Sequence, residues 1–291
     1  MNFFPSRHRS CSACSKRTVT VKGEPVAEYF HRGVVFHLVG FRISMPLDVE
    51  MMRPGEGEVR AAQRLLERVL LRYGRFFDVI LADALYVKAP FFNLCLGHGK
   101  DVIAVLKGQK GALFQDAQGV FSAIKPKLWK ENRCQIRAWD EEGFTTAEGV
   151  RAPLRVLHTE ETVLRRHRHN QQWVEKTEIH HWWWVTTLPI ARMPTRRLWQ
   201  IAHRRWEIEN DLFHTLVTYW SLDHCFKHRA TAIVNFVLTL FIAFMLVQSF
   251  YYGNLKIQRR QQFTLIGLAT ELLVSLVAMD TPAPWMSPPG G

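Results

Sequence analysis

With 291 residues, 47% of them hydrophobic, the chain is long and apolar enough to bury a sizeable core, which excludes a disordered tail. Its 38 Lys and Arg outnumber its 26 Asp and Glu, and the net charge of +12 favours a polyanionic partner, nucleic acid ahead of a membrane surface. Five scattered cysteines argue against a disulfide framework, and the first residues lack a secretory signal, so we expect a cytoplasmic protein.

The first 75 or so residues read as a loop, then antiparallel strands, then a helix. Cys11 and Cys14 form one C-x-x-C pair in the loop, but a structural zinc site normally has a second pair, so metal binding there is left open. Alternating apolar and β-branched residues predict two or three strands ending near Met52. The segment 56–73 has apolar residues at helical spacing and acids at its start, which predicts a helix.

Strands then alternate with helices, which predicts a parallel portion of sheet. The short apolar run 76–82 is typical of a buried strand, and Asp83 follows it directly. A helix is expected from Pro90 through Gly97, a second buried strand over 101–107 and a short helix over 111–121.

From 125 to 190 the pattern changes to period-two segments rich in tryptophan, threonine, arginine and histidine, which predicts a β-rich insertion. Its aromatic and basic side chains suit stacking on unpaired bases and neutralising phosphates. The same "WWWV" run is equally typical of a strand that only packs its sheet. The candidate DNA-binding residues of this insertion are Trp182, Trp183, Trp184, Arg165, Arg166 and Arg168.

A helix is predicted over 196–221, where the stretch "RRWEIENDLF" carries three acids. At 100° per residue, Arg205 and Glu209 fall within the apolar stripe, whereas Glu207 and Asp211 point to the opposite side. A carboxylate in an apolar stripe requires a partner, which either an ion pair with Arg205 or a bound metal supplies.

The last part of the chain holds a long apolar run and a polar tail. Residues 230–252 are long enough to cross a membrane, but the surrounding α/β pattern favours a helix buried in a core. Residues 279–291 are rich in proline and glycine, and we expect them to be disordered.

Asp83 and Glu209 lie far apart in a basic chain, and both occupy positions where carboxylates do chemistry. Ligands of α/β sheets gather at the carboxyl ends of strands, where Asp83 is expected, although a turn or capping role also explains this aspartate. Two such carboxylates suggest Mg²⁺ or Mn²⁺ held beside a phosphodiester, the arrangement of nucleases and strand-transfer enzymes.

The segments that carry these residues resemble the DDE transposases of bacterial insertion sequences, of the IS-four-like group with an RNase H-like catalytic core. The resemblance extends from about Arg7 to Phe250 and rests on four segments, "FDVILADALYVKAPFFNL", "GKDVIAVLKGQ", "WWWVTTLP" and "RRWEIENDLFHTL...LDHCFKH". It implies that Asp83 is the second catalytic acid, that Glu209 is the last one, and that Arg205 orients Glu209 and touches phosphate. It also implies that 125–190 is the insertion subdomain of that family.

Three departures from the family pattern concern the catalytic set. The first aspartate of the family precedes a stretch similar to the one at the start of this chain, so the resemblance implies truncation, with Asp48 as the nearest stand-in. Ala202 and Leu216 stand where the family has a tyrosine and a lysine. His214 or Lys227 then replaces that lysine as a phosphate contact, and Lys107, just after a strand, is a further candidate.

The sequence thus predicts an α/β protein with an RNase H-like mixed sheet flanked by helices and a β-rich insertion. We expect the N-terminal part of the core over 1–124, the insertion over 125–190, the helical part of the core over 191–278, and the tail. The resemblance implies Mg²⁺-dependent cut-and-paste transposition on double-stranded DNA, at terminal inverted repeats and target sites, by a homodimer in a synaptic complex, with little or no activity from this chain. The alternatives are a catalytically dead DNA-binding remnant and a membrane protein anchored by 230–252; no stable membrane association is expected.

Overall fold

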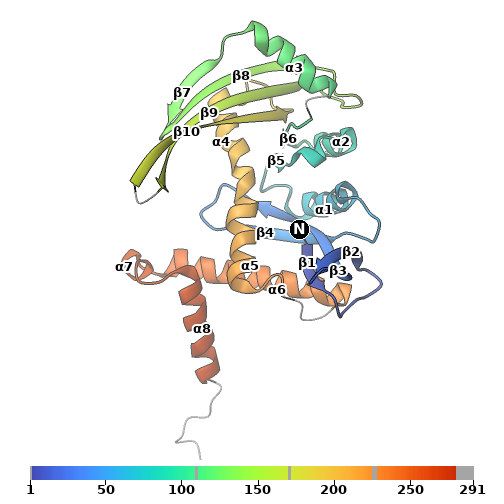
Figure 1. Cartoon of the computed structure of the whole chain (residues 1–291), viewed down its shortest axis with the longest axis vertical. Helices are drawn as coiled ribbons and strands as arrows, with labels where there is room; N and C mark the ends of the chain where they lie inside the picture. Colours follow the sequence, from blue (N-terminus) through green and yellow to red (C-terminus); the bar gives the residue numbers. More distant parts are fainter. Residues whose placement is uncertain (1, 109–110, 170–171, 225–227, 280–291) are drawn as a thin grey trace, which may run out of the picture. The chain divides into compact units, whose positions relative to one another are not determined.

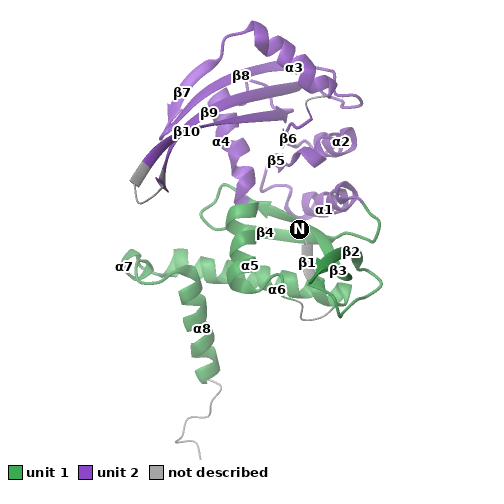
Figure 2. Ribbon diagram, viewed as in Figure 1, with its two compact units in different colours: residues 1–56, 208–291 green, residues 57–207 purple. Residues whose placement is uncertain are grey.

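The computed structural model describes residues 2–108, 111–169, 172–224 and 228–279 (Figure 1). The chain forms two compact units (Figure 2): unit 1 comprises 1–56 and 208–291, and unit 2 comprises 57–207. Unit 2 is therefore inserted in the sequence of unit 1. The division predicted at 124, 190 and 278 follows changes of sequence pattern and stays a prediction, and the predicted tail lies outside the described residues from position 280 onward.

Unit 1 begins with a small antiparallel sheet around one long strand. Strand β3 pairs with β1 and β2 along one part of its length and with β4 along another. The strands end at Met51, close to the predicted end at Met52. Their bounds are β1 Asn2–Ser6, β2 Ser15–Val21, β3 Glu24–Leu38 and β4 Met45–Met51.

Helices from the end of the chain complete unit 1. Its apolar core joins Val35 and Val49 of the sheet to Leu212 and Leu216 and to the buried face of α6. Burial of these aliphatic and aromatic groups is what holds together two segments so far apart in sequence. The helices are α5 His214–Trp220, α6 Ala230–Ser249, α7 Ile257–Arg260 and α8 Leu265–Met279, with single turns at Ile208–Phe213 and Phe250–Asn254.

Helix α6 packs against β4 through one face. Ile233, Val237 and Phe241 are buried, whereas Ile242 and Leu246 are 55% and 64% exposed, so the expectation that this helix is buried all round is wrong. By length and composition, 230–254 forms a helix that can cross a membrane, but core helices of soluble proteins meet the same criterion.

A buried glutamine fixes the end of α6. The Gln248 amide accepts a hydrogen bond from the Ser44 N–H (2.9 Å) and donates one to the Ser44 carbonyl oxygen (3.1 Å). Both polar groups of this side chain are satisfied, which explains how an amide is tolerated within the apolar run.

Unit 2 contains a mixed six-stranded sheet in the order β5-β6-β10-β9-β8-β7. Strands β5 and β6 are parallel, as the alternation of strands and helices predicted, and the other pairs are antiparallel. The α/β class, with a mixed sheet flanked by helices, is confirmed. The strands of the β-rich stretch join this same sheet through the β6–β10 pair. The bounds are β5 Val79–Ala82, β6 Asp101–Val105, β7 Lys127–Glu131, β8 Cys134–Phe144, β9 Leu154–His169 and β10 Gln172–Thr186.

Aromatic side chains on β10 show which helices cover the two faces of this sheet. Trp183 contacts Phe114 of α3, with ring centroids 4.3 Å apart, whereas its neighbour Trp184 packs in the cluster that contains Leu198 and Trp199 of α4. Because neighbouring side chains of a strand point to opposite faces, α3 and α4 cover different faces. The helices of unit 2 are α1 Glu58–Tyr73, α2 Ala89–Gly97, α3 Ala112–Ala123 and α4 Thr195–His203.

A buried ionic network holds the start of α4 to the sheet. Arg155 of β9 donates two hydrogen bonds of 2.7 Å to the Asp140 carboxylate of β8, and both side chains are almost fully buried. Thr195 donates to the same carboxylate over 2.5 Å, and Arg155 also donates to the Met193 carbonyl oxygen. The charges are thus paired and hydrogen-bonded, which is what a buried ion pair requires.

Candidate functional site

Asp83 lies where β5 ends and caps the short 3₁₀ turn Ala84–Tyr86, with its Oδ1 accepting a hydrogen bond from the Ala84 N–H (2.7 Å). The capping role left open by the sequence is therefore real, but the side chain stays 44% exposed. The position at the carboxyl end of a parallel strand is the one where α/β sheets bind ligands.

The turn that carries Asp83 is held by a partly buried tyrosine. The Tyr86 hydroxyl donates a hydrogen bond of 2.6 Å to Glu58 of α1. Burial, the hydrogen bond to Glu58 and the nearby carboxylates raise the pKa of Tyr86 far above its ordinary value, so the phenol stays protonated and keeps donating. This contact fixes the turn while leaving Asp83 accessible.

Lys107 follows β6, the parallel neighbour of β5, and its Nζ lies 4.0 Å from the Asp83 Oδ1. The structure therefore brings together two of the predicted site residues at the carboxyl ends of adjacent parallel strands. The Lys107 side chain is 69% exposed, and such a pair contributes little to stability. A solvated lysine beside a solvated carboxylate instead provides a cation that is free to contact a phosphate.

An open hollow of about 430 Å³ adjoins these two residues. Ala84, next to Asp83, lines it together with Lys107 and Gly108, and residues of α2, of α3 and of the connection between β8 and β9 also line it. The strand ends of unit 2 thus border a concave surface.

The predicted helix over 196–221 is interrupted twice. Helix α4 ends at His203, a 3₁₀ turn spans Arg204–Trp206, and a π-helical turn spans Ile208–Phe213 before α5 begins. The expectation that Glu209 lies in the buried stripe is therefore wrong, because these turns change the rotation per residue, and Glu209 is exposed together with Asp211. The flanking Ala202 and Leu212 are fully buried, as the stripe predicted.

Arg205 belongs to unit 2, and its guanidinium carbon lies 4.5 Å from the centre of the Trp206 ring. Trp206 in turn packs edge-on against Trp182, with centroids 4.7 Å apart. An aromatic cluster thus positions Arg205. Asp83 is in the same unit, whereas Glu209 belongs to unit 1, where it lies in the π turn.

Asp48, the stand-in for the first aspartate, lies in unit 1 on β4 opposite Phe36 of β3. It is 7% exposed, and its Oδ1 accepts a hydrogen bond from the Val49 N–H (2.7 Å). A nearly buried carboxylate in the middle of a paired strand has little room for a metal ion and its waters, so Asp48 is poorly placed to be a metal ligand.

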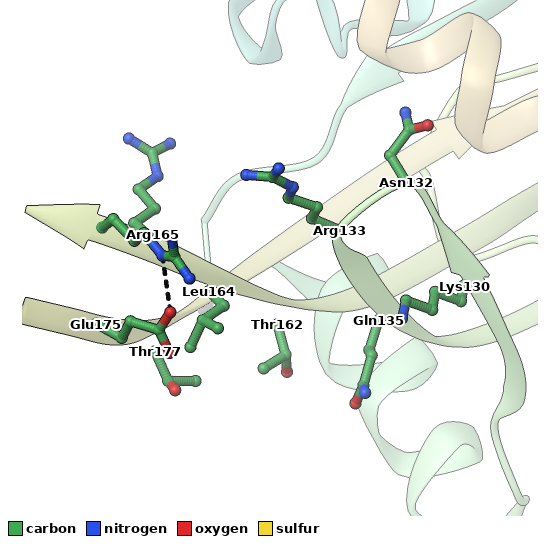
Figure 3. Close-up of a pocket in the computed structure, with 10 residues that line it drawn as sticks. Lys130, Asn132, Arg133, Gln135, Thr162, Leu164, Arg165, Glu175 and Thr177 are labelled. Atoms are coloured by element: carbon green, nitrogen blue, oxygen red, sulfur yellow. Dashed lines mark hydrogen bonds and ion pairs between the residues drawn. The ribbon is translucent and has the colours of Figure 1, made fainter.

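Basic side chains line a hollow of about 960 Å³ on the long β8–β10 ribbon (Figure 3). Arg166 donates a 2.8 Å hydrogen bond to Glu175 across the strands, and Arg165 forms an ion pair with Glu178 over 3.2 Å. The sequence had not singled out Lys130 or Arg133, which add two further cations because the β7–β8 turn places them at this hollow.

The remaining DNA-binding candidates differ in their surroundings. Arg168 is exposed near the end of β9 and His214 is exposed at the start of α5, whereas Lys227 lies outside the described residues. The Trp183 ring stacks on His158 at 4.0 Å and also contacts Phe114. Trp183 therefore packs against its sheet, which is one of the two interpretations that the "WWWV" run left open. Trp184 is fully buried and serves the same purpose.

A basic α/β protein with an exposed carboxylate and a lysine at the ends of adjacent parallel strands has the charge and the site position that suit a phosphate-containing ligand. The sequence model of one family, described as the transposase DDE domain, matches residues 14–246. The chain therefore belongs to the DDE transposase family. A comparison with curated proteins finds no match.

Membership in this family confirms the resemblance to DDE transposases that was drawn from the sequence segments, and the mixed six-stranded sheet flanked by helices is consistent with an RNase H-like fold. The protein is transposase-like, and its family acts on DNA and generally uses divalent metal ions.

Proposed function

We propose that this protein is a DNA transposase of the IS-four-like group that cuts double-stranded DNA at the ends of an insertion sequence and joins those ends to a target. The observation that carries the proposal is the placement of Asp83, exposed at the carboxyl end of β5 beside Lys107, in a chain of the DDE family. Asp83 and Glu209 are the proposed ligands of Mg²⁺ or Mn²⁺.

The available side chains fit such ions. Hard divalent cations take carboxylate oxygens and retain several waters, so they require acids that remain open to solvent. Asp83 is 44% exposed and Glu209 is also exposed. As the family resemblance implies, divalent ions held by these acids would activate the attacking oxygen and stabilise the leaving one at the phosphodiester.

Basic residues have supporting roles in this proposal. Arg205, held against Trp206, would orient Glu209 and contact a phosphate. Lys107 would neutralise a phosphate next to Asp83 once the carboxylate is occupied by a cation. His214 would contact the DNA end in place of the lysine of the family pattern.

The hollow formed by Lys130, Arg133, Arg165 and Arg166 is the proposed DNA-binding surface of unit 2, with Arg168 at its margin. Figure 3 shows Arg133 and Arg165 on the same side of the ribbon. Contacts of this kind bind phosphates without regard to sequence and release counterions, so affinity should fall steeply with salt.

Two carboxylates hold divalent ions less firmly than three, so we expect residues 1–291 by themselves to cleave weakly or not at all. The family resemblance implies a third acid for full activity. We propose that the protein acts in the cytoplasm as a homodimer on paired DNA ends, without a stable membrane association. The alternative is a DNA-binding remnant without catalysis, which the exposed basic hollow also supports.

The test is Mg²⁺-dependent nicking of a plasmid that carries the terminal inverted repeats flanking the gene. The 291-residue chain is compared with a version extended upstream by an in-frame D-G-x-E-like segment. We expect Asp83→Asn and Glu209→Gln to reduce nicking by the extended protein to background, because each removes a charged ligand.

Two neighbouring acids provide matched controls. Asp78, 89% exposed just before β5, controls for Asp83, and the exposed Asp211 controls for Glu209. Asp78→Asn and Asp211→Asn should nick like the parent. If Asp83→Asn or Glu209→Gln nicks without loss, that residue is not a ligand; salt-sensitive DNA binding without any nicking by the extended protein would favour the remnant.

A further inference from the structure

A cysteine and histidine cluster in unit 1 plays no part in the proposed DNA chemistry. Cys11 and Cys14 lie in the turn between β1 and β2, with their Sγ atoms 3.7 Å apart. The Cys14 N–H donates to the Cys11 carbonyl oxygen (3.1 Å), and the Cys11 N–H points at the Cys14 sulfur over 3.2 Å. A disulfide needs sulfurs about 2.05 Å apart, so these two side chains are not bonded to each other.

His31 of β3 brings a third donor atom between the two sulfurs. Its Nε2 lies 3.4 Å from the Cys11 Sγ and 3.3 Å from the Cys14 Sγ. The three donor atoms all lie within 4.8 Å of one another, and the His31 side chain is almost fully buried at 2% exposure.

His228, from the segment 208–291 of unit 1, contacts the same cluster. Its Nδ1 lies 3.2 Å from the Cys14 Sγ, and its ring centre lies 5.4 Å from that of His31. His228 is 6% exposed and lies two residues before the start of α6 at Ala230. Two sulfurs and two imidazoles from three separate segments therefore converge in a buried part of unit 1.

Hydrogen bonding between the side chains does not account for all of these contacts. A neutral imidazole nitrogen has either one lone pair or one proton, so the His31 Nε2 makes one strong contact and not two equal contacts with Cys11 and Cys14. A cation at the centre attracts all the donor atoms at once. Tetrahedral zinc, with Zn–S near 2.3 Å and Zn–N near 2.0–2.1 Å, places its sulfurs about 3.8 Å apart and sulfur about 3.5 Å from nitrogen.

We propose that Cys11, Cys14, His31 and His228 form a structural Zn²⁺ site. Among Cys11, Cys14 and His31, the sulfur–sulfur distance of 3.7 Å and the sulfur–nitrogen distances of 3.3–3.4 Å match that tetrahedral geometry. His228, with its Nδ1 3.2 Å from the Cys14 Sγ, is the proposed fourth ligand. Two thiolates with two imidazoles suit zinc rather than magnesium or calcium, which take oxygen ligands. The second C-x-x-C pair that the sequence lacked is replaced by two histidines distant in sequence.

The site has a clear structural purpose in unit 1. This unit is assembled from 1–56 and 208–291, and the ligands come from both segments. Zinc would tie the turn between β1 and β2 and the start of α6 to β3. Since binding occurs only when these segments are folded together, the metal stabilises unit 1.

The direct test measures metal in the whole 291-residue chain, purified under reducing conditions without chelator. We expect about one zinc per chain by elemental analysis, as one four-ligand site requires. Replacement by Co²⁺ should give the intense visible absorption of a tetrahedral ion together with near-ultraviolet thiolate charge-transfer bands. A chain that takes up neither metal would overturn the proposal.

Variants then assign the ligands. Cys11→Ser and Cys14→Ser should abolish stoichiometric zinc, while Cys134→Ser, a thiol outside the cluster, should retain it. His228→Ala should weaken zinc binding at least about tenfold in a chelator competition, because it leaves three ligands. Unchanged affinity in His228→Ala would remove His228 from the set, and zinc retained by Cys11→Ser/Cys14→Ser would refute the site.

The melting temperature of the parent protein tests the same site without any substitution, so this test does not depend on whether a variant folds. Chelator should lower the melting temperature of the parent by several degrees, and added Zn²⁺ should restore it. A parent melting temperature that is identical with chelator and with Zn²⁺ would contradict a structural role. These readouts do not depend on DNA cleavage, so the zinc proposal stands or falls separately from the transposase proposal.

Discussion

The buried pair of Asp140 and Arg155 provides the sharpest prediction for stability. Asp140→Asn keeps the shape of the side chain but removes its charge, which leaves the Arg155 guanidinium, 1% exposed, without a counterion. Asp140 accepts two hydrogen bonds of 2.7 Å from Arg155 and one of 2.5 Å from Thr195. An amide has one acceptor oxygen, so at least one of these bonds is lost.

The expected cost follows from this geometry. A hydrogen bond to a charged group contributes about 1.5–3 kcal/mol, and an uncompensated buried charge adds its desolvation, so breaking such a pair costs about 3–5 kcal/mol. Native domains are stable by about 5–15 kcal/mol, so Asp140→Asn should remove a large share of the free energy of unfolding.

The assay is urea unfolding of the whole chain, followed by tryptophan fluorescence, for a double-mutant cycle. Asp140→Asn, Asp140→Leu and Arg155→Met should each be strongly destabilising. The double variant Asp140→Leu/Arg155→Met, which closes the cycle, should recover much of the loss because no buried charge is left over. A cost below about 1 kcal/mol for Asp140→Asn would show that the pair is solvated and would refute this reasoning.

Two further predictions concern pH and a buried amide. Burial, with a further contribution from His181, lowers the pKa of His158 to about 4, so only the unfolded chain takes a proton as the pH falls below about 6.5. The free energy of unfolding should therefore fall between about pH 6.5 and 4. His158→Phe keeps the stack on Trp183 and should make this pH dependence weaker in urea titrations. An unchanged pH dependence would show that His158 does not cause it. Gln248→Leu leaves both backbone groups of Ser44 without their side-chain partner and should cost about 1–3 kcal/mol of unfolding free energy, whereas an unchanged midpoint would mean that water replaces the amide.

The sequence predicts a helix or strand well where a periodic apolar face within one short segment specifies it. The helix over 56–73 is observed as α1, and the buried strand before Asp83 is observed as β5, since a periodic apolar face specifies each of them. The parallel pairing of β5 and β6 followed from the alternation of strands and helices. The same alternation allows the proximity of Asp83 and Lys107 to be predicted. Each residue follows one of two adjacent parallel strands, β5 and β6.

Long-range contacts explain what the sequence did not reveal. His31 and His228 are separated from the C-x-x-C pair by other elements, and only folding brings their rings to Cys14. The basic hollow likewise arises because the β7–β8 hairpin brings Lys130 and Arg133 to the same hollow as Arg165 and Arg166 of β9. No periodicity within one segment encodes either arrangement.

The interrupted helix around Glu209 is a case in which a broken local rule points to function. In a continuous α-helix this carboxylate would share the buried stripe of Ala202 and Leu212, where an unpaired charge is costly. The π turn over 208–213 rotates it outward, so Glu209 remains solvated while Leu212 stays fully buried. Single π turns are rare and occur frequently at functional sites. Asp211 is exposed in the same turn, so exposure does not distinguish the two acids. Glu209 remains the proposed metal ligand because the family resemblance places the last acid four residues after the arginine, which is Arg205 here.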